Sequence, residues 1–195
     1  MYKELRLMYD MPDVDIDFAD RTRLLKHVQG IGARLDTGIK HNTGVYFTDI
    51  PVAHDGLATL EHKHAEELGY FKLDLLNVNV YEHVKNELDL VNLMRDPNWL
   101  LLLDKTFFER VIHIGNHFDL SCQMPEPIDS IPRMAMFLAV IRPGKRHLVG
   151  KTWGEVAQTV WQPPSAGSYY FKKSHSVAYA QLVTVHMNIL EEQRG

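Results

Sequence analysis

The chain has 195 residues, of which 45% are hydrophobic and 24% charged, and its formal net charge is −4. This composition is typical of a globular protein with a sizeable core, and it excludes a chain that is basic throughout, so any nucleic-acid surface must be a local patch. The single cysteine, Cys122, excludes an internal disulfide framework and a multi-cysteine zinc site. It fits a reducing cytoplasm, where we expect the protein. No apolar run approaches the ~20 residues of a membrane span and no signal-peptide core follows Met1, so no membrane partner is expected.

Three aspartates alternate in the first predicted strand, where residues 12–18 read Pro-Asp-Val-Asp-Ile-Asp-Phe. A strand places every second side chain on the same face. The carboxylates of Asp13, Asp15 and Asp17 are therefore expected to point one way, while the apolar side chains between them point into a core.

The rest of the first half alternates predicted helices and strands. Asp20 is a plausible N-cap for a helix with this apolar face: Leu24, Leu25, Val28, Ile31 and Leu35. Residues 44–50 and 70–76 are expected to form strands. A further helix, ending before Pro97, is predicted from the spacing of Tyr81, Val84, Leu88 and Val91.

The second half is expected to be mainly helical. Asp104 and Ser130 are predicted N-caps, the second for a helix that runs to about Ile141. Residues 152–155 form a capping box, and Ser174 is expected to cap the last helix. The sequence thus predicts an α+β protein with a mixed region over residues 1–100 and a helical region over residues 101–195.

A fourth aspartate, Asp74, lies in the predicted strand at residues 70–76. Clustered carboxylates repel one another and usually require a cation, and two divalent ions held by shared carboxylates are a recurring device for phosphoryl transfer.

Three other interpretations of the aspartate run are open. A calcium loop also spaces aspartates two apart, but it needs glycine at its sixth position, where this chain has Phe18. An aspartate-nucleophile phosphatase uses Asp-x-Asp, yet its downstream partners are not evident. A charged edge strand that faces water is the simplest alternative. Aspartate is a poor strand former, which favours a metal site.

Five segments, in order along the chain, resemble motifs of the catalytic (alpha) subunit of bacterial DNA polymerase III, the C family of polymerases. Residues 12–18, followed by Asp-Arg at 20–21, are similar to its first palm motif, and Phe-Lys-Leu-Asp-Leu-Leu at 71–76 to its second. His-Asn-Thr-Gly-Val at 41–45, Arg-Pro-Gly at 142–144 and Lys-Ser-His-Ser-Val-Ala-Tyr-Ala at 173–180 resemble three further motifs.

The resemblance implies a nucleotidyltransferase-type palm followed by a helical fingers-like region. It implies that Asp15, Asp17 and Asp74 hold two magnesium ions, with manganese as a possible substitute, and Asp13 is a weaker candidate. One ion would lower the pKa of a primer 3′-hydroxyl, and the other would neutralise the triphosphate. Lys72 is expected on the same face as Asp74, near the incoming triphosphate, although it also fits a simple charge partner for the aspartates.

Two basic groups are expected to contact phosphates: Arg142, Lys145, Arg146, Lys172, Lys173 and His175. Such contacts bind nucleic acid without sequence preference. The alternative is a solvated surface, and His175 also fits a core histidine. His41 is expected to be structural, Tyr179 to pack on the last helix, and His62 and His64 lack the further ligands of a metal site.

The sequence departs from the family pattern in two respects. Residues 1–11 contain neither the glycine nor the serine of the family's upstream phosphate-binding motif, and the fingers-like segment is short, with no thumb apparent. Two functions therefore remain. The first is a minimal metal-dependent DNA polymerase or nucleotidyltransferase that uses a primer-template and deoxynucleoside triphosphates, and that a protein partner or homo-oligomerisation would complete. The second is a non-catalytic protein, derived from a polymerase core, that binds DNA or a replisome component.

Overall fold

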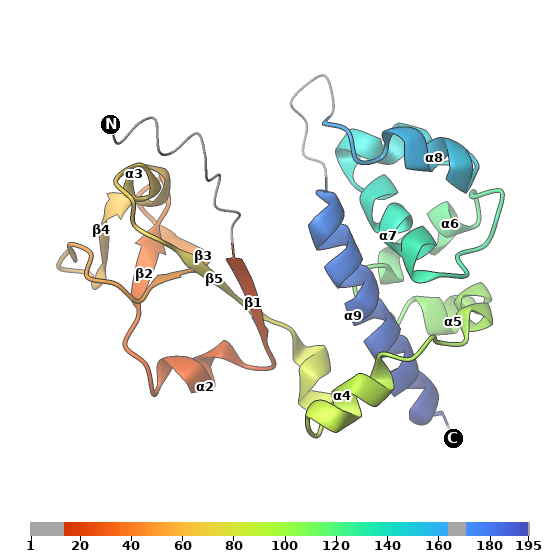
Figure 1. Ribbon diagram of the computed structural model, residues 1–195, viewed down its shortest axis with the longest axis horizontal. Coiled ribbons are helices and arrows are strands. Elements are labelled where there is room, and N and C mark those ends of the chain that lie inside the picture. The colour runs from red at the N-terminus through yellow and green to blue at the C-terminus, as the bar shows by residue number, and fades with distance from the viewer. Residues whose placement is uncertain (1–13, 164–170, 195) are drawn as a thin grey trace. The chain divides into compact units, whose positions relative to one another are not determined.

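The computed structural model describes residues 14–163 and 171–194. The chain divides into two compact units, Met1–His83 and Val84–Gly195. The first contains a mixed five-stranded sheet and the second is built from helices, which confirms an α+β protein (Figure 1). The division puts helix α4 (Glu87–Leu93) in the second unit, whereas the sequence-based boundary near residue 100 assigned it to the first.

The first unit is a sheet with strand order β1-β5-β3-β2-β4. Strand β1 pairs with β5 and β2 with β4 in parallel, while β3 runs antiparallel to both β2 and β5. Its elements are β1 (Val14–Phe18), α2 (Arg21–Leu25), β2 (Ile31–Arg34), β3 (Lys40–Tyr46), β4 (Leu57–Glu61), α3 (His62–Glu67), β5 (Leu73–Asn77) and the 3-10 helix η1 (Asn79–His83).

Helix α3 covers one face of this sheet. Its Ala65 packs in a small core with Tyr46 of β3 and Ala33 of β2, all three fully buried. Gly44 lies two residues before Tyr46 and therefore on the same face, and Asp74 of β5 is directly opposite Gly44. The register thus sets Asp74 on the α3 face of the sheet.

The helix predicted after Asp20 is shorter than expected. The Asp20 carboxylate accepts a hydrogen bond from the backbone nitrogen of Thr22 at 2.9 Å, so the predicted cap is confirmed. The helix ends at Leu25, and Ile31 instead pairs with Tyr46 as the first residue of β2. Gly30 and Gly32 flank Ile31 and disfavour helix, so strand pairing prevails over the helical spacing of the apolar residues.

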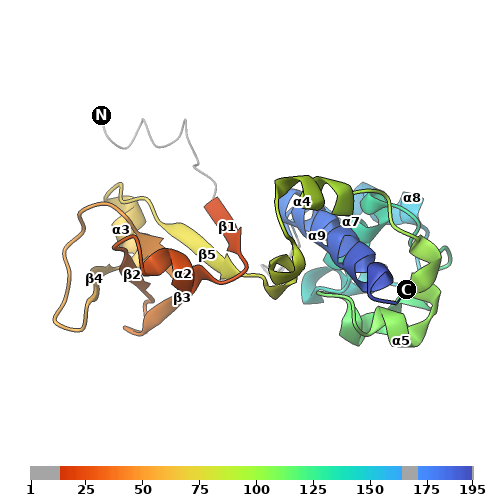
Figure 2. The same cartoon turned by 90° about the horizontal axis from the view of Figure 1, so that it is seen from below.

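In the second unit, the long helix α9 packs along α7 and beside α4 (Figures 1 and 2). The elements after α4 are η2 (Trp99–Leu103), α5 (Lys105–Phe108), η3 (Gly115–His117), α6 (Phe118–Ser121), α7 (Ile131–Val140), η4 (Pro143–Leu148), α8 (Trp153–Thr159) and α9 (Lys173–Glu192). The core of this unit includes the fully buried side chains of Phe108, Phe137 and Val183.

The predicted helix caps of the second unit are mostly confirmed. Asp104, Ser130 and the Thr152–Glu155 capping box all accept backbone hydrogen bonds at the first turns of their helices. The last helix begins two residues earlier than predicted, with Lys172 as its N-cap in place of Ser174, so Ser174 lies within its first turn. In the part of the chain that the structure describes, no helix is both long enough and apolar enough to cross a lipid bilayer.

Candidate functional site

Three of the predicted carboxylates share one face of the sheet. Asp15 of β1 is the register partner of Asp74 of β5, and strand alternation puts Asp17 on the same side as Asp15. Asp15 and Asp17 are exposed, while Asp74 is half-buried. Asp13 lies outside the described residues.

β1 is an edge strand of the sheet, as required by the alternative in which its aspartates are simply surface charges that face water. Its aspartates nevertheless lie beside a half-buried carboxylate of the neighbouring strand, so the acidic group extends from the edge into the sheet.

Both oxygens of Asp74 have partners. The Lys72 ammonium forms an ion pair with Oδ2, and the Thr43 hydroxyl donates a hydrogen bond to Oδ1 at 2.7 Å. Burial of the Asp74 carboxyl acts to raise its pKa, but these two hydrogen bonds and the charges of Lys72 and His41 outweigh burial and hold the pKa below its ordinary value. Asp74 is therefore a fixed, ionised carboxylate.

His41 shapes the segment that carries Thr43. Its Nδ1 accepts a hydrogen bond from the backbone nitrogen of Gly44 at 2.9 Å and lies 3.7 Å from Oδ1 of Asp74. Its ring packs edge-on against His62 of α3, with 5.3 Å between ring centroids. Because Nδ1 acts as an acceptor, a neutral His41 ring carries its proton on Nε2.

Asp17 experiences a different environment from Asp74. Partial desolvation, and then the charge of Asp15, raise the pKa of the Asp17 carboxyl above its ordinary value. Burial, and then the charge of Asp17, likewise raise the pKa of Tyr81 in η1. The charges of neighbouring aspartates thus act on Asp17 and on Tyr81, whereas Asp74 pairs with the Lys72 ammonium.

The three carboxylates share one face of the sheet and offer the oxygen ligands that Mg²⁺ prefers. Among the residues described, however, no group of three or more His, Cys, Asp or Glu side chains is arranged to hold a metal ion. Both oxygens of Asp74 already accept one contact each, from the Lys72 ammonium and the Thr43 hydroxyl.

The first basic group divides into residues with different roles. Lys145 is buried, with 4% of its surface exposed, and its ammonium donates a hydrogen bond to the Thr159 carbonyl oxygen at the end of α8, at 2.6 Å. Burial lowers the pKa of Lys145. Arg146 is exposed and donates to the Ile141 carbonyl oxygen at 2.7 Å. Lys145 thus has a structural role in this fold and does not present its charge to a phosphate.

Arg142 and His175, which are 33 residues apart in sequence, are brought together by Phe171. The Arg142 guanidinium lies over the Phe171 ring, 4.8 Å from its centroid, and the same ring stacks on His175 at 6.0 Å. Phe171 also stacks on Tyr179 at 5.3 Å, so the predicted packing residue of α9 belongs to this group. We call Arg142, His175, Phe171 and Tyr179, with His113, the Arg142 cluster.

His113 and its neighbour His117 were not identified from the sequence. The His113 ring packs edge-on against Tyr179, with 4.4 Å between centroids, and its backbone has a positive φ of 66°. Burial, then the charge of Arg142, lower the pKa of His113; burial, then Arg146 and Arg142, lower that of His117. No sequence pattern marks either histidine, because only the tertiary fold brings them near Arg142.

The Arg142 cluster contains two buried nitrogen atoms that lack a hydrogen-bond partner within the described residues, Nε of Arg142 and Nε2 of His113. Buried polar groups are normally paired. Nε of Arg142 is a donor and therefore points to an unmet acceptor such as an anion or water, whereas Nε2 of His113 can donate or accept, depending on the tautomer of the ring. A polar hollow of about 270 Å³ adjoins His113, lined by Glu109, Val111, His113, Gly115, Asn116 and His117.

The second predicted basic group lies at the N-terminus of α9. Lys172 and Lys173 are both exposed, and Lys172 is the N-cap residue of this 20-residue helix. The N-terminus of a helix favours anions. The structure therefore places two cations and a helix N-terminus one turn or less from His175 of the Arg142 cluster.

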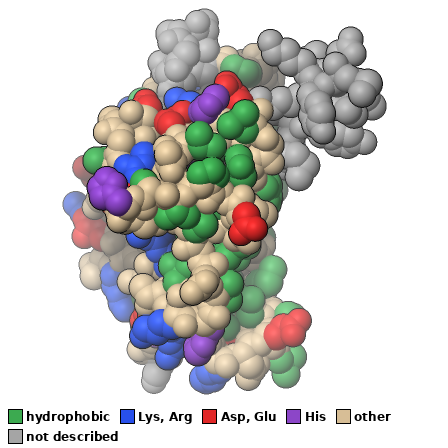
Figure 3. Space-filling model, turned by 90° about the vertical axis from the view of Figure 1, so that its left-hand side faces the viewer, with side chains coloured by type: hydrophobic (Ala, Val, Ile, Leu, Met, Phe, Trp, Pro, Cys, Tyr) green, Lys and Arg blue, Asp and Glu red, His purple; other side chains and the backbone are tan. Residues whose placement is uncertain are grey.

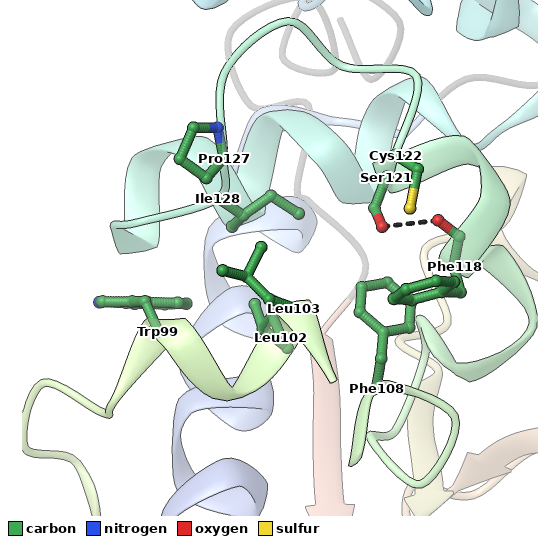
Figure 4. A pocket seen from close by; sticks show the side chains of 9 residues that line it. All are labelled: Trp99, Leu102, Leu103, Phe108, Phe118, Ser121, Cys122, Pro127 and Ile128. Atoms are coloured by element: carbon green, nitrogen blue, oxygen red, sulfur yellow. Dashed lines mark hydrogen bonds between the residues drawn. The ribbon is translucent and has the colours of Figure 1, made fainter. Parts of the chain in front are cut away.

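An apolar hollow of about 90 Å³ in the second unit contains none of the predicted site residues (Figure 4). Its lining is Trp99, Leu102, Leu103, Phe108, Phe118, Ser121, Cys122, Pro127 and Ile128. The Ser121 hydroxyl donates to the Phe118 carbonyl oxygen at 2.7 Å, so even this polar atom is already paired. The hollow does not suit a charged nucleotide.

The face of the molecule drawn in Figure 3 carries side chains of both charges. On the face drawn in Figure 3, acidic, basic and hydrophobic side chains intermingle among the coloured residues, and no single charge dominates.

Comparisons with protein-family models, with curated protein sequences and with solved structures gave no match.

Proposed function

We propose that the protein is a metal-dependent nucleotidyltransferase, a minimal C-family-like DNA polymerase that adds deoxynucleotides to a primer 3′-hydroxyl. Under this proposal the first unit is a nucleotidyltransferase-type palm and the second is a fingers-like region. The observation that carries the proposal is the register of β1 and β5, which sets Asp15 opposite Asp74 and Asp17 on the same face. These are the three residues that the motif resemblance assigns to metal binding.

The residues of the first unit have separate roles in this reaction. Asp15, Asp17 and Asp74 would hold two magnesium ions, which when bound activate the 3′-hydroxyl and neutralise the triphosphate. Thr43 fixes the orientation of the Asp74 carboxylate through its 2.7 Å hydrogen bond. Lys72 lies on the same face and supplies a positive charge for a phosphate once it leaves Asp74.

The second unit would supply phosphate contacts. Arg142 of the Arg142 cluster and the exposed lysines Lys172 and Lys173 offer positive charge, and the His175 ring, which stacks on the same Phe171 as Arg142, lies one turn or less from the two lysines. His113 is an added candidate, because its Nε2 is buried and unpaired within the described structure. Contacts of this kind would bind triphosphate or DNA backbone without reading sequence.

Primer extension tests the proposal. The purified protein is incubated with a labelled primer-template, all four deoxynucleoside triphosphates and either Mg²⁺ or Mn²⁺. Extension by the parent protein, lost in Asp15→Ala and Asp74→Ala, supports the proposal. Retained extension in either variant excludes the carboxylates as the catalytic group.

We expect the activity in the cytoplasm, since the single cysteine fits a reducing compartment.

A non-catalytic DNA- or replisome-binding protein is the second candidate. Two observations favour a non-catalytic role. The aspartates of β1 lie on an edge strand, and the negative charge of Asp74 is already paired with the ammonium of Lys72. This candidate predicts DNA binding in a gel-shift assay, no extension with either metal, and the same DNA affinity in Asp15→Ala as in the parent.

A further inference from the structure

A polar hollow in the second unit lies outside the carboxylate site and is formed by one short stretch of chain. All of its lining residues belong to residues 109–117, the loop that joins α5 to α6, and its volume is about 270 Å³. A single water needs only about 10–15 Å³. The hollow can therefore hold a polyatomic ion such as phosphate.

The loop that forms the hollow is held in place on both sides of His113. The backbone nitrogen of Ile112 donates a hydrogen bond to Nδ1 of His186 in α9, at 3.0 Å, and the side chain of Ile114 is fully buried. A ligand that enters the hollow thus meets a loop that is already ordered, which lowers the entropy cost of binding.

The backbone of His113 has an uncommon conformation. Its φ is 66°, in the left-handed region that residues other than glycine rarely adopt. Such conformations cost free energy, and they are concentrated at binding and catalytic sites, where the surrounding structure maintains them. The contacts of Ile112 and Ile114 maintain this one, so the fold holds the His113 ring in a defined position beside the hollow.

The His113 ring has one nitrogen that needs a partner. Nε2 is buried, and no hydrogen-bond partner for it is found in the part of the chain that the structure describes. Nε of Arg142, a donor in the same cluster, is buried and unpaired as well. Since buried polar atoms are normally paired, the two nitrogens indicate a polar ligand that residues 14–163 and 171–194 do not supply.

The charges around the hollow favour an anion. Burial is the first cause that lowers the pKa of His113 and of His117, and the charge of Arg142 adds to it at both rings, joined by Arg146 at His117. A positive field that disfavours an imidazolium attracts negative charge to the same place.

One carboxylate, that of Glu109, also lines the hollow. It lies 3.8 Å from the ammonium of Lys105, and both side chains are more than half exposed, at 53% and 58%. Solvent and Lys105 therefore screen its charge, which weakens the attraction for an anion but does not cancel the field of two arginines.

We propose that the hollow formed by residues 109–117 is a binding site for a phosphate group, with His113 and His117 as its hydrogen-bonding side chains and Arg142 as the nearby positive charge. The oxygens of a phosphate accept several hydrogen bonds at once, which suits this set of nitrogen atoms. The inference rests on the proposed function for the source of the phosphate, a nucleotide or a nucleic-acid backbone. It needs neither the carboxylates nor catalysis.

Titration with inorganic phosphate at pH 7 and constant ionic strength, followed in amide ¹H–¹⁵N correlation spectra, tests the site. The parent should show saturable shifts at the amides of Gly115 and Asn116. His113→Asn removes the ring but keeps a residue type that tolerates positive φ, and we expect it to bind phosphate at least tenfold more weakly. His147→Gln removes an exposed histidine of the same unit and should stay within about twofold of the parent.

His117→Gln covers the case in which His113→Asn fails to fold. It removes the second ring of the hollow and should weaken phosphate binding about threefold or more. Two further titrations of the parent identify the source of the phosphate. A deoxynucleoside triphosphate or a short single-stranded oligodeoxynucleotide that shifts the same amides at lower concentration than inorganic phosphate is that source. Saturable binding of inorganic phosphate alone supports the site and assigns it to the free ion.

Shifts that grow linearly without saturation overturn the inference, and so do saturable shifts at Lys172 and Lys173 that leave the loop unchanged. Equal affinity for phosphate in the parent and in folded His113→Asn overturns it as well. The two proposals fail separately. Absence of primer extension by a parent that binds phosphate at the loop overturns only the enzymatic function. Extension by the parent, with no shift of the loop amides, overturns only the phosphate site.

Discussion

The Thr43 hydroxyl donates a 2.7 Å hydrogen bond to Oδ1 of Asp74, across two neighbouring antiparallel strands. Together with Lys72 on the other oxygen, this contact keeps Asp74 ionised and fixed in orientation. Its loss should therefore be measurable both as stability and as a change in the titration of the carboxyl group.

We expect Thr43→Val to destabilise the first unit at pH 7 by about 0.5–1.5 kcal/mol, the usual net contribution of one hydrogen bond. The pKa of Asp74 is lowered in the folded protein, so the carboxylate contributes stability that is present above the ordinary aspartate pKa of about 3.9 and is lost as pH falls through the folded value. The difference between variant and parent should shrink in the same range.

Hydrogen exchange of β3 and β5 amides, read by mass spectrometry between pH 2 and 7, reports on this unit alone, after correction for the pH dependence of intrinsic exchange. Thr43→Ser retains the hydroxyl and is the control. A destabilisation by Thr43→Val that stayed constant down to pH 2 would contradict the role given to the Asp74 carboxylate.

Asp17 should respond in the opposite sense. Its pKa is raised in the folded protein, so folding carries a penalty that is absent below about pH 3.9 and appears as pH rises through the folded pKa. We expect Asp17→Asn to be more stable than the parent at pH 7 in the presence of a chelator, by a few tenths of a kcal/mol after screening. The same variant should lose metal-dependent extension.

Urea denaturation of parent and Asp17→Asn at pH 3.5 and pH 7, followed by circular dichroism, measures the first effect. The gain should be absent at the lower pH. A loss of stability at pH 7 would mean that Asp17 makes a favourable contact in the metal-free protein.

The local features of the fold were predictable from sequence, because their causes are local. Asp20, Asp104 and Ser130 each cap a helix through a side chain two or three residues from the backbone nitrogen that it accepts from. The alternation of Asp15 and Asp17 in a strand was predictable for the same reason, since it follows from the pleat.

Features that depend on distant partners were not predictable. β4 and α3, which follow one another over Leu57–Glu67, are short and carry no strong periodicity, so pairing with β2 and packing of Ala65 decide their form. The Arg142 cluster joins segments around residues 113, 142 and 171–179, and nothing in any one of them indicates the others. Lys145 shows that a local pattern can also mislead. It lies in a run of basic residues, which predicts an exposed charge, yet it is buried against α8.

Arg142 and Lys145 lie three residues apart in sequence, but we expect their substitutions to act differently: a change of Arg142 on ligand binding and a change of Lys145 on stability. Because its guanidinium lies over Phe171 with a buried, unpaired Nε, Arg142 is available to an anion. We expect Arg142→Gln to weaken binding of deoxynucleoside triphosphate about tenfold or more, measured calorimetrically at low salt. Arg110→Gln, which changes an exposed arginine of the same unit, is the control. Unchanged affinity in Arg142→Gln would remove the cluster from the nucleotide site.

Lys145→Met should act on stability and not on binding. The change keeps the buried stem but leaves the Thr159 carbonyl oxygen without its donor, at a cost of about 1–3 kcal/mol. All three tryptophans, Trp99, Trp153 and Trp161, lie in the second unit, so urea denaturation followed by tryptophan fluorescence isolates the effect. Weaker triphosphate binding by a Lys145→Met protein that is fully folded would contradict the structural role.

The proposed function requires that Asp15 and Asp74 act as one catalytic group. The most direct test is the rate of single-nucleotide addition to a primer-template by the parent, Asp15→Asn and Asp49→Asn, with Mg²⁺ and with Mn²⁺. Asp49 is an exposed aspartate of the same unit and lies outside the group. We predict addition by the parent and by Asp49→Asn, and a loss of at least a hundredfold in Asp15→Asn. Equal rates in the parent and Asp15→Asn, or no addition by the parent with either metal, would contradict the account.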